Sequence, residues 1–159
     1  MTQKMTENLE FQALLKQVME EKIPFCQLLG IKLASFNPDK PEISIDMREQ
    51  LHGNFSKGML HGGVIASVLD RVAGFAILLK MAQQNPKDDV LSQIKEFSRM
   101  STIDLRIDYL QPGLGQSFTA SAEVTRLGKR IANVVMNLRN EKHERIATGA
   151  AAFMLHEKA

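Results

Sequence analysis

The chain has 159 residues, of which 44% are hydrophobic and 24% charged, values typical of one globular domain with its own core. Its 20 basic and 18 acidic residues leave a net charge of +2, too small for a dedicated nucleic-acid binder. A single cysteine excludes an internal disulfide, and residues 1–10 are polar rather than signal-like. We therefore expect a cytoplasmic location.

Residues 5–22 carry apolar side chains at helical spacing, which predicts an amphipathic helix with Thr6 as its N-cap and Pro24 beyond its end. We assign residues 1–23 to this helix and residues 24–159 to a single domain. Residues 31–36 and 42–48 read as two strands of a hairpin, because a turn signal at residues 37–39 separates them.

A glycine-rich stretch at residues 52–58 is too irregular for helix or strand, and it leads into the apolar segment 59–82. Asp70 and Arg71 in the middle of this segment would each cost about 2.5 to 3.5 kcal/mol at a bilayer centre. We therefore interpret it as a buried helix rather than a membrane span. Because it is apolar nearly all round, it must be enclosed on most sides.

Residues 83–101 are polar and predict a loop with a helical turn at 90–97. Four strands follow at 102–110, 116–127, 131–139 and 145–155, with turn signals close enough for an antiparallel meander. We expect Ile103, Leu105, Ile107 and Tyr109 to share one face of the first. This element order predicts an α+β hotdog fold: a curved antiparallel sheet of about six strands around one long helix, with an added N-terminal helix.

The sharpest chemical signal is His61-Gly62-Gly63 at the expected helix start. Glycines there leave backbone N–H groups approachable, and the helix dipole adds positive potential, so the site suits an anion or a developing oxyanion. The alternative is a tight loop-to-helix turn without a ligand.

Asp70 is the second signal, since a carboxylate on an apolar helix carries a desolvation cost unless it is paired or used. Its helical neighbours are the small residues Ala66, Ser67, Ala73 and Gly74, which indicates that a ligand or another helix packs close. The alternative is a solvent-exposed edge of the helix.

Gly62 and Asp70 are eight residues apart, about 12 Å along a helix, so one chain cannot bring both to one reacting atom. If both act in one site, two antiparallel copies of the helix must lie side by side. A two-fold dimer gives that arrangement and two equivalent sites.

With Thr102-Ile103-Asp104-Leu105 and Tyr109-Leu110-Gln111-Pro112-Gly113, the segment from His61 to Asp70 resembles the hotdog-fold acyl-CoA thioesterases of the PaaI type. The resemblance spans residues 24–155. It implies that Gly62 offers its N–H to the thioester carbonyl and that His61 shapes that loop. It also implies that Asp70 of the partner subunit acts as general base or nucleophile. Thr102 matches a family position whose side chain holds the water or the carboxylate. Asn54 is the nearest match to a polar residue that the family has ahead of its glycines.

We place Gly63 and Ser67 beside the substrate. Arg126, Lys129 and Arg130 flank a predicted turn and are candidates for the phosphates of coenzyme A, although such residues are often only solvated. The four histidines show no metal-ligand spacing, and no cofactor is expected because coenzyme A is part of the substrate.

The sequence thus predicts an acyl-CoA thioesterase that acts as a homodimer or a dimer of dimers, without nucleic acid or membrane insertion. A hotdog acyl hydratase or dehydratase and a non-catalytic acyl-thioester binding module are the alternatives. Aromatic and medium- or long-chain acyl groups both stay open as substrates.

Overall fold

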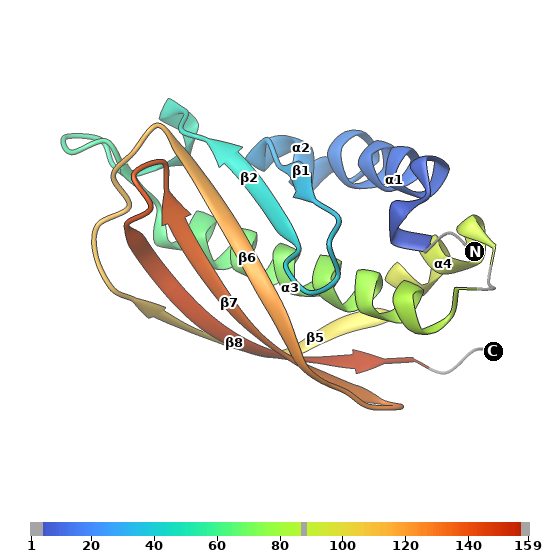
Figure 1. The fold of residues 1–159 in the computed structure, drawn as a ribbon. Helices are drawn as coiled ribbons and strands as arrows, with labels where there is room; N and C mark the ends of the chain where they lie inside the picture. The colour runs from blue at the N-terminus through green and yellow to red at the C-terminus, as the bar shows by residue number, and fades with distance from the viewer. Residues whose placement is uncertain (1–4, 87–88, 157–159) are drawn as a thin grey trace.

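A long helix, α3 (Gly62–Gln84), lies along a curved antiparallel sheet in the computed structural model, which describes residues 5–86 and 89–156 (Figure 1). The described sheet has six strands in the order β1-β2-β6-β7-β8-β5. Their bounds are β1 (Lys32–Ser35), β2 (Glu42–Asp46), β5 (Met100–Tyr109), β6 (Ser117–Leu127), β7 (Ile131–Asn140) and β8 (Arg145–Leu155). The predicted α+β hotdog architecture is confirmed.

The core lies between α3 and the sheet. Every residue from Val72 to Leu79 is buried, including Phe75, whose ring packs edge-on against Phe36 with centroids 5.6 Å apart. By length and composition α3 could cross a bilayer. Its apolar side chains are instead enclosed by β6, β7 and other elements of the same chain, as expected for a core helix.

The N-terminal region is more broken than one helix. It comprises η1 (Met5–Glu7), α1 (Leu9–Lys16), a π-helical turn η2 (Gln17–Lys22) and α2 (Pro24–Leu29). The N-cap prediction was wrong: Asn8 accepts bonds from the Glu10 and Phe11 N–H groups, whereas Thr6 is buried and its carbonyl accepts from Gln12. Pro24 begins a second helix, because its fixed φ suits a first helical position.

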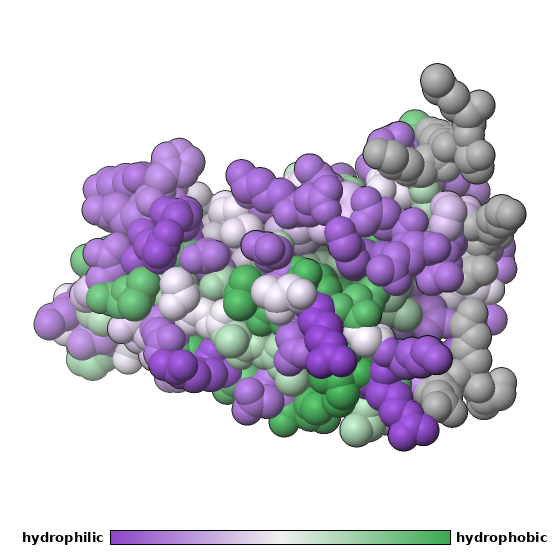
Figure 2. Space-filling model, turned by 60° about the horizontal axis from the view of Figure 1, so that its bottom comes forward, coloured by the Kyte–Doolittle hydropathy of each residue, from purple (hydrophilic) through white to green (hydrophobic). Residues whose placement is uncertain are grey.

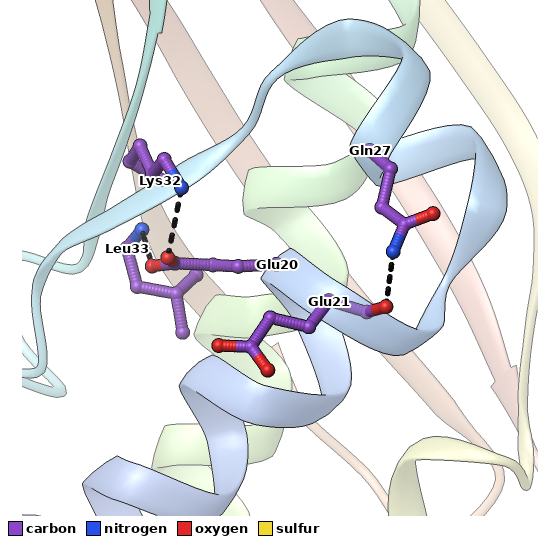
Figure 3. A network of polar contacts seen from close by, with 5 residues as sticks. All are labelled: Glu20, Glu21, Gln27, Lys32 and Leu33. Carbon is purple, nitrogen blue, oxygen red and sulfur yellow. Dashed lines mark hydrogen bonds and ion pairs between the residues drawn. The ribbon is translucent and has the colours of Figure 1, made fainter.

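Glu20 ties this region to the sheet (Figure 3). Its carboxylate accepts from the Leu33 backbone N–H at 2.8 Å and lies 3.4 Å from the Lys32 ammonium group. In the same view the Gln27 amide donates to the Glu21 carbonyl. Phe11, Leu15 and Met19 are buried in the common core, so these helices cover part of it.

The order of the last four strands corrects the predicted meander. β6, β7 and β8 follow one another, but β5 pairs with β8 at the sheet edge, with Tyr109 opposite Ala147. Turn signals place strands along the chain, but they do not show on which side of a hairpin a preceding strand enters.

The predicted apolar face of β5 is also not fully buried. Ile103 and Tyr109 are 50% and 55% exposed, while Leu105 and Ile107 are only partly covered. β5 is an edge strand, and its register shifts between Thr102 and Asp104. This chain alone therefore leaves the strand open on one side.

Two further elements lie beside α3. The glycine-rich stretch forms part of a ribbon, β3 (His52–Asn54) with β4 (Met59–Leu60), after a short turn η3 (Glu49–Leu51), so the expectation of no regular structure there was wrong. Met59 and Leu60 thus precede the helix rather than begin it. The predicted helical turn at 90–97 is confirmed as α4 (Val90–Phe97), capped by Asp89.

Candidate active site

The start of α3 is organised by His61. As N-cap, it accepts the Gly63 N–H on its ring nitrogen Nδ1 at 2.8 Å. Nδ1 must be unprotonated to accept, so a neutral ring carries its proton on Nε2. The Gly63 N–H is therefore already bonded to the imidazole.

The backbone N–H of Gly62, in contrast, stays available as a hydrogen-bond donor. Within the part of the chain that the structure describes, its N–H donates to no group, while its carbonyl accepts from the Tyr109 hydroxyl at 2.9 Å. A Cβ on Gly62 would lie 3.4 Å from the Tyr109 ring, which leaves little room for a side chain. A bare N–H at the positive end of a 23-residue helix suits a developing oxyanion.

The β3–β4 ribbon fixes this corner from the other side. The His61 N–H donates to the Leu51 carbonyl at 2.8 Å, and a Cβ on Gly53 would lie 2.8 Å from the His61 Cα, closer than a side chain allows. Asn54 lies in the ribbon, but its side-chain oxygen accepts from the N–H and hydroxyl of Ser56. The structure thus gives that oxygen a local role in the turn.

Asp70 lies eight residues after Gly62, about two helical turns beyond this corner, and is half-buried. Thr102 of β5 donates its hydroxyl to the Asp70 carboxylate at 2.7 Å, so the structure joins two of the predicted site residues. Ser67, between the two sites, donates its hydroxyl to the Gly63 carbonyl at 2.7 Å. The contact with Thr102 orients the carboxylate and leaves its other oxygen for a water or substrate.

A small cavity of about 130 Å³ adjoins Asp70. Its lining includes Gly74 from α3, Phe97 from α4, and Phe153 from β8. The Arg71 guanidinium lies over the Phe97 ring, 5.3 Å from its centroid. Outside α3 the lining thus combines the Phe97 and Phe153 rings with Met100 and Thr102.

The predicted phosphate ligands lie elsewhere. Arg126, Lys129 and Arg130 are exposed around the β6–β7 turn. Lys129 lines a separate cavity of about 230 Å³, which also touches the C-terminal end of α3.

Sequence reasoning did not assign a site role to Tyr109 or to α4. The Tyr109 signal is its place at the end of β5, directly before the Leu110-Gln111-Pro112-Gly113 turn. For α4 the signal is the apolar spacing of Val90, Ile94 and Phe97, which predicts one buried face.

Cys26 is not part of this site. It is buried, and burial raises the pKa of its thiol, which favours the unreactive protonated form. In that environment Cys26 acts as a small packing residue.

Residues 57–147 match the Thioesterase superfamily. Over 135 residues the chain is also 36% identical to the medium/long-chain acyl-CoA thioesterase YigI of Escherichia coli strain K12, covering 84% of this chain and 86% of YigI. The chain belongs to the thioesterase superfamily. It is thus an enzyme of the thioester hydrolase class.

Solved structures agree with this assignment. A thioesterase-superfamily protein from Shewanella oneidensis is 35% identical, with a TM-score of 0.82 over 93% of this chain and 99% of its own. The E. coli PaaI protein is 18% identical with a TM-score of 0.71, over 94% of this chain and 96% of its own, and thus shares the fold. The predicted membership among hotdog-fold thioesterases is confirmed.

Proposed function

We propose that this thioesterase hydrolyses acyl-CoA to a free acid and coenzyme A, with Asp70 of one subunit and Gly62 of its partner at one site. The single observation that carries the proposal is the Thr102–Asp70 bond at 2.7 Å, which holds a half-buried carboxylate in one orientation. The acyl-CoA thioesterase YigI, similar over most of the chain, supports the substrate class.

In the reaction, the Asp70 carboxylate takes a proton from water while the water oxygen attacks the thioester carbonyl carbon. The carbonyl oxygen gains negative charge, which the Gly62 N–H of the partner subunit stabilises. The tetrahedral intermediate then breaks its C–S bond, and the leaving thiolate takes the proton back from Asp70. In the alternative, the Asp70 carboxylate attacks the carbonyl carbon itself and the C–S bond breaks to release the thiolate. Water then hydrolyses the resulting anhydride, which frees the acid, regenerates Asp70 and supplies the proton that the thiolate takes up.

The remaining site residues take supporting roles. Thr102 orients Asp70, His61 holds the helix start, and Ser67 and Asn54 lie around the glycine corner. Gly63 contributes a backbone that allows close approach, since its N–H serves the cap. We assign the phosphate end of coenzyme A to the cations around the β6–β7 turn, Arg126, Lys129 and Arg130.

A two-fold dimer through the open side of α3 and β5 supplies the partner's Gly62. β5 is an edge strand, and Ile103, Tyr109 and the adjacent Leu110 are about half exposed. The surface in Figure 2 likewise carries hydrophobic side chains in its middle, bordered by hydrophilic ones. Burial of such a strip between two copies favours association. A dimer of dimers and a cytoplasmic location fit the same proposal.

Hybrid dimers test the shared site. Asp70→Asn removes the base, while Gly62→Pro removes the N–H at a first helical position that tolerates proline. Each variant alone should lose about 100-fold or more in kcat, as measured by thiol release from acyl-CoA. After mixing and random exchange of subunits, one of two sites in half of the dimers is intact, so about a quarter of the wild-type activity should return.

The control is each variant mixed with itself, which should stay inactive. Dimer mass and thermal unfolding show whether both variants fold. If the mixture stays as inactive as its folded components, the two groups do not meet across subunits. Near-wild-type turnover by folded Asp70→Asn would overturn the assignment of the base itself.

A further inference from the structure

A second cavity, of about 230 Å³, lies between the C-terminal end of α3, the start of β5 and the β6–β7 turn. Three potentially cationic side chains, Arg99, Lys129 and His156, line it. One acid, Glu96, shares the lining and contacts Arg99, Nη1 to Oε1, at 3.2 Å. A guanidinium has five N–H donors, so this contact fixes the arginine without using all of them. The cavity thus combines apolar walls with cations, as a phosphate-bearing ligand requires.

Arg99 and His156 are held together by the backbone. The His156 N–H donates to the Arg99 carbonyl at 2.9 Å, and its ring nitrogen Nε2 lies 3.1 Å from the Ser101 hydroxyl. Lys129 comes from the opposite wall, the β6–β7 turn. The cations therefore converge from separate segments rather than from one exposed run.

This cavity adjoins the one beside Asp70. Met100 lines both, and the first cavity is bounded by Gly74 on α3. A Cβ on Gly74 would lie 3.7 Å from the Phe97 and Phe153 rings, so the glycine leaves space that a larger side chain would fill. The two cavities thus share Met100 as a common wall, and we call the route from Asp70 past Gly74 and Met100 to the cations the slot.

The length of this path matches coenzyme A. Its pantetheine arm has about thirteen bonds between sulfur and the first phosphorus, which extend to about 16 Å at the advance per bond of an extended polypeptide. Met81, eleven positions after Asp70 on α3, lines the cationic cavity, and the helix rises about 16 Å over that interval. A thioester held at Asp70 would thus carry its phosphates to this cavity.

We infer that the pantetheine arm runs through the slot past Gly74 and Met100, and that Arg99 and His156 join Lys129 in binding the phosphates. This inference rests on the proposed acyl-CoA hydrolysis. It adds Arg99 and His156 to the phosphate-binding residues of the β6–β7 turn. It also assigns the apolar cavity beside Asp70 to the pantetheine arm rather than to the acyl chain. The acyl chain then leaves the carbonyl on the opposite side.

Three octanoyl thioesters test the phosphate site: octanoyl-CoA, octanoyl-pantetheine and octanoyl-N-acetylcysteamine. Lys129→Gln should lower kcat/KM for octanoyl-CoA about threefold and Arg99→Gln about tenfold, mainly through KM. Neither should change kcat/KM for the two carriers that lack phosphate. Because Lys129 is exposed, its variant does not depend on the Glu96 contact for folding.

Lys142→Gln is the matched control, since Lys142 lies in the turn at the other end of β7 and should leave all three substrates unchanged. Equal losses on all three carriers, or no loss on octanoyl-CoA, would overturn the phosphate assignment. The proposed hydrolysis fails separately: in that case Asp70→Asn would retain turnover of octanoyl-N-acetylcysteamine.

Gly74→Val tests the slot. It should lower kcat/KM about tenfold or more for octanoyl-CoA and octanoyl-pantetheine, and much less for N-acetylcysteamine thioesters, whose short carrier does not extend beyond Gly74. The same pattern should hold for acetyl and octanoyl groups. If the loss instead grows with acyl length on every carrier, the slot holds the acyl chain and the inference is wrong.

Discussion

The two halves of α3 have the same backbone but different surroundings. From Val72 to Leu79 every residue is buried by elements of the same chain. Between His61 and Asp70 only Ile65, Val68 and Leu69 are buried, and the glycines, Ser67 and Asp70 stay open to different degrees. The helix is a core element after Asp70 and a site element before it.

The difference shows how a small fold can carry chemistry. The buried half makes the helix rigid, because close-packed interiors resist displacement. The open half then presents an N–H and a carboxylate at fixed positions without depending on a flexible loop. Apart from Gly74, which lines the cavity beside Asp70, substitutions in the buried half should change stability, whereas substitutions in the open half should change activity.

Phe75→Ala is expected to have the largest effect on the buried half. The ring is fully buried against Phe36, so truncation should cost about 3 to 5 kcal/mol of the free energy of unfolding. Chemical denaturation measures the loss, and kcat per folded molecule at low temperature should stay within about twofold of wild type. A large fall in kcat with unchanged stability would contradict the division of the helix.

Thr102→Val should have a smaller effect, on activity alone. It removes the hydroxyl that donates to Asp70 while nearly conserving volume, and a hydrogen bond to a charged group contributes about 1.5 to 3 kcal/mol. We expect kcat to fall about 10- to 100-fold with little change in thermal unfolding, because Thr102 is exposed in the single chain. Thr102→Ser keeps the donor and should restore most activity. Equal losses in both variants would point to shape rather than to the hydroxyl.

Much of this division could be predicted from the sequence. The apolar run around Asp70 predicted a largely buried helix, and alternating side chains located the strands near their observed bounds. Gly62 and Gly63 indicated the helix start, because glycines there leave the backbone N–H groups approachable.

The rest depended on contacts distant in sequence. That β5 pairs with β8 follows from how the chain returns after α4, which no local pattern encodes. Asn8 and Thr6 are both acceptable caps by type, and packing of Thr6 into the core decided between them. Similarly, only the fold shows that the His61 ring occupies the Gly63 N–H and leaves the Gly62 N–H open.

Tyr109→Phe should have the smallest effect on activity, and it tests the contact between β5 and the start of α3. The lost bond to the Gly62 carbonyl contributes about 0.5 to 1.5 kcal/mol, while the ring that packs beside Gly62 remains. Because that bond holds the peptide next to the N–H that we propose as the oxyanion donor, kcat should fall about two- to tenfold and KM should change less. Thermal unfolding should stay nearly unchanged, since Tyr109 is 55% exposed. Unchanged kcat would mean that packing against the β3–β4 ribbon alone holds the glycine corner in place.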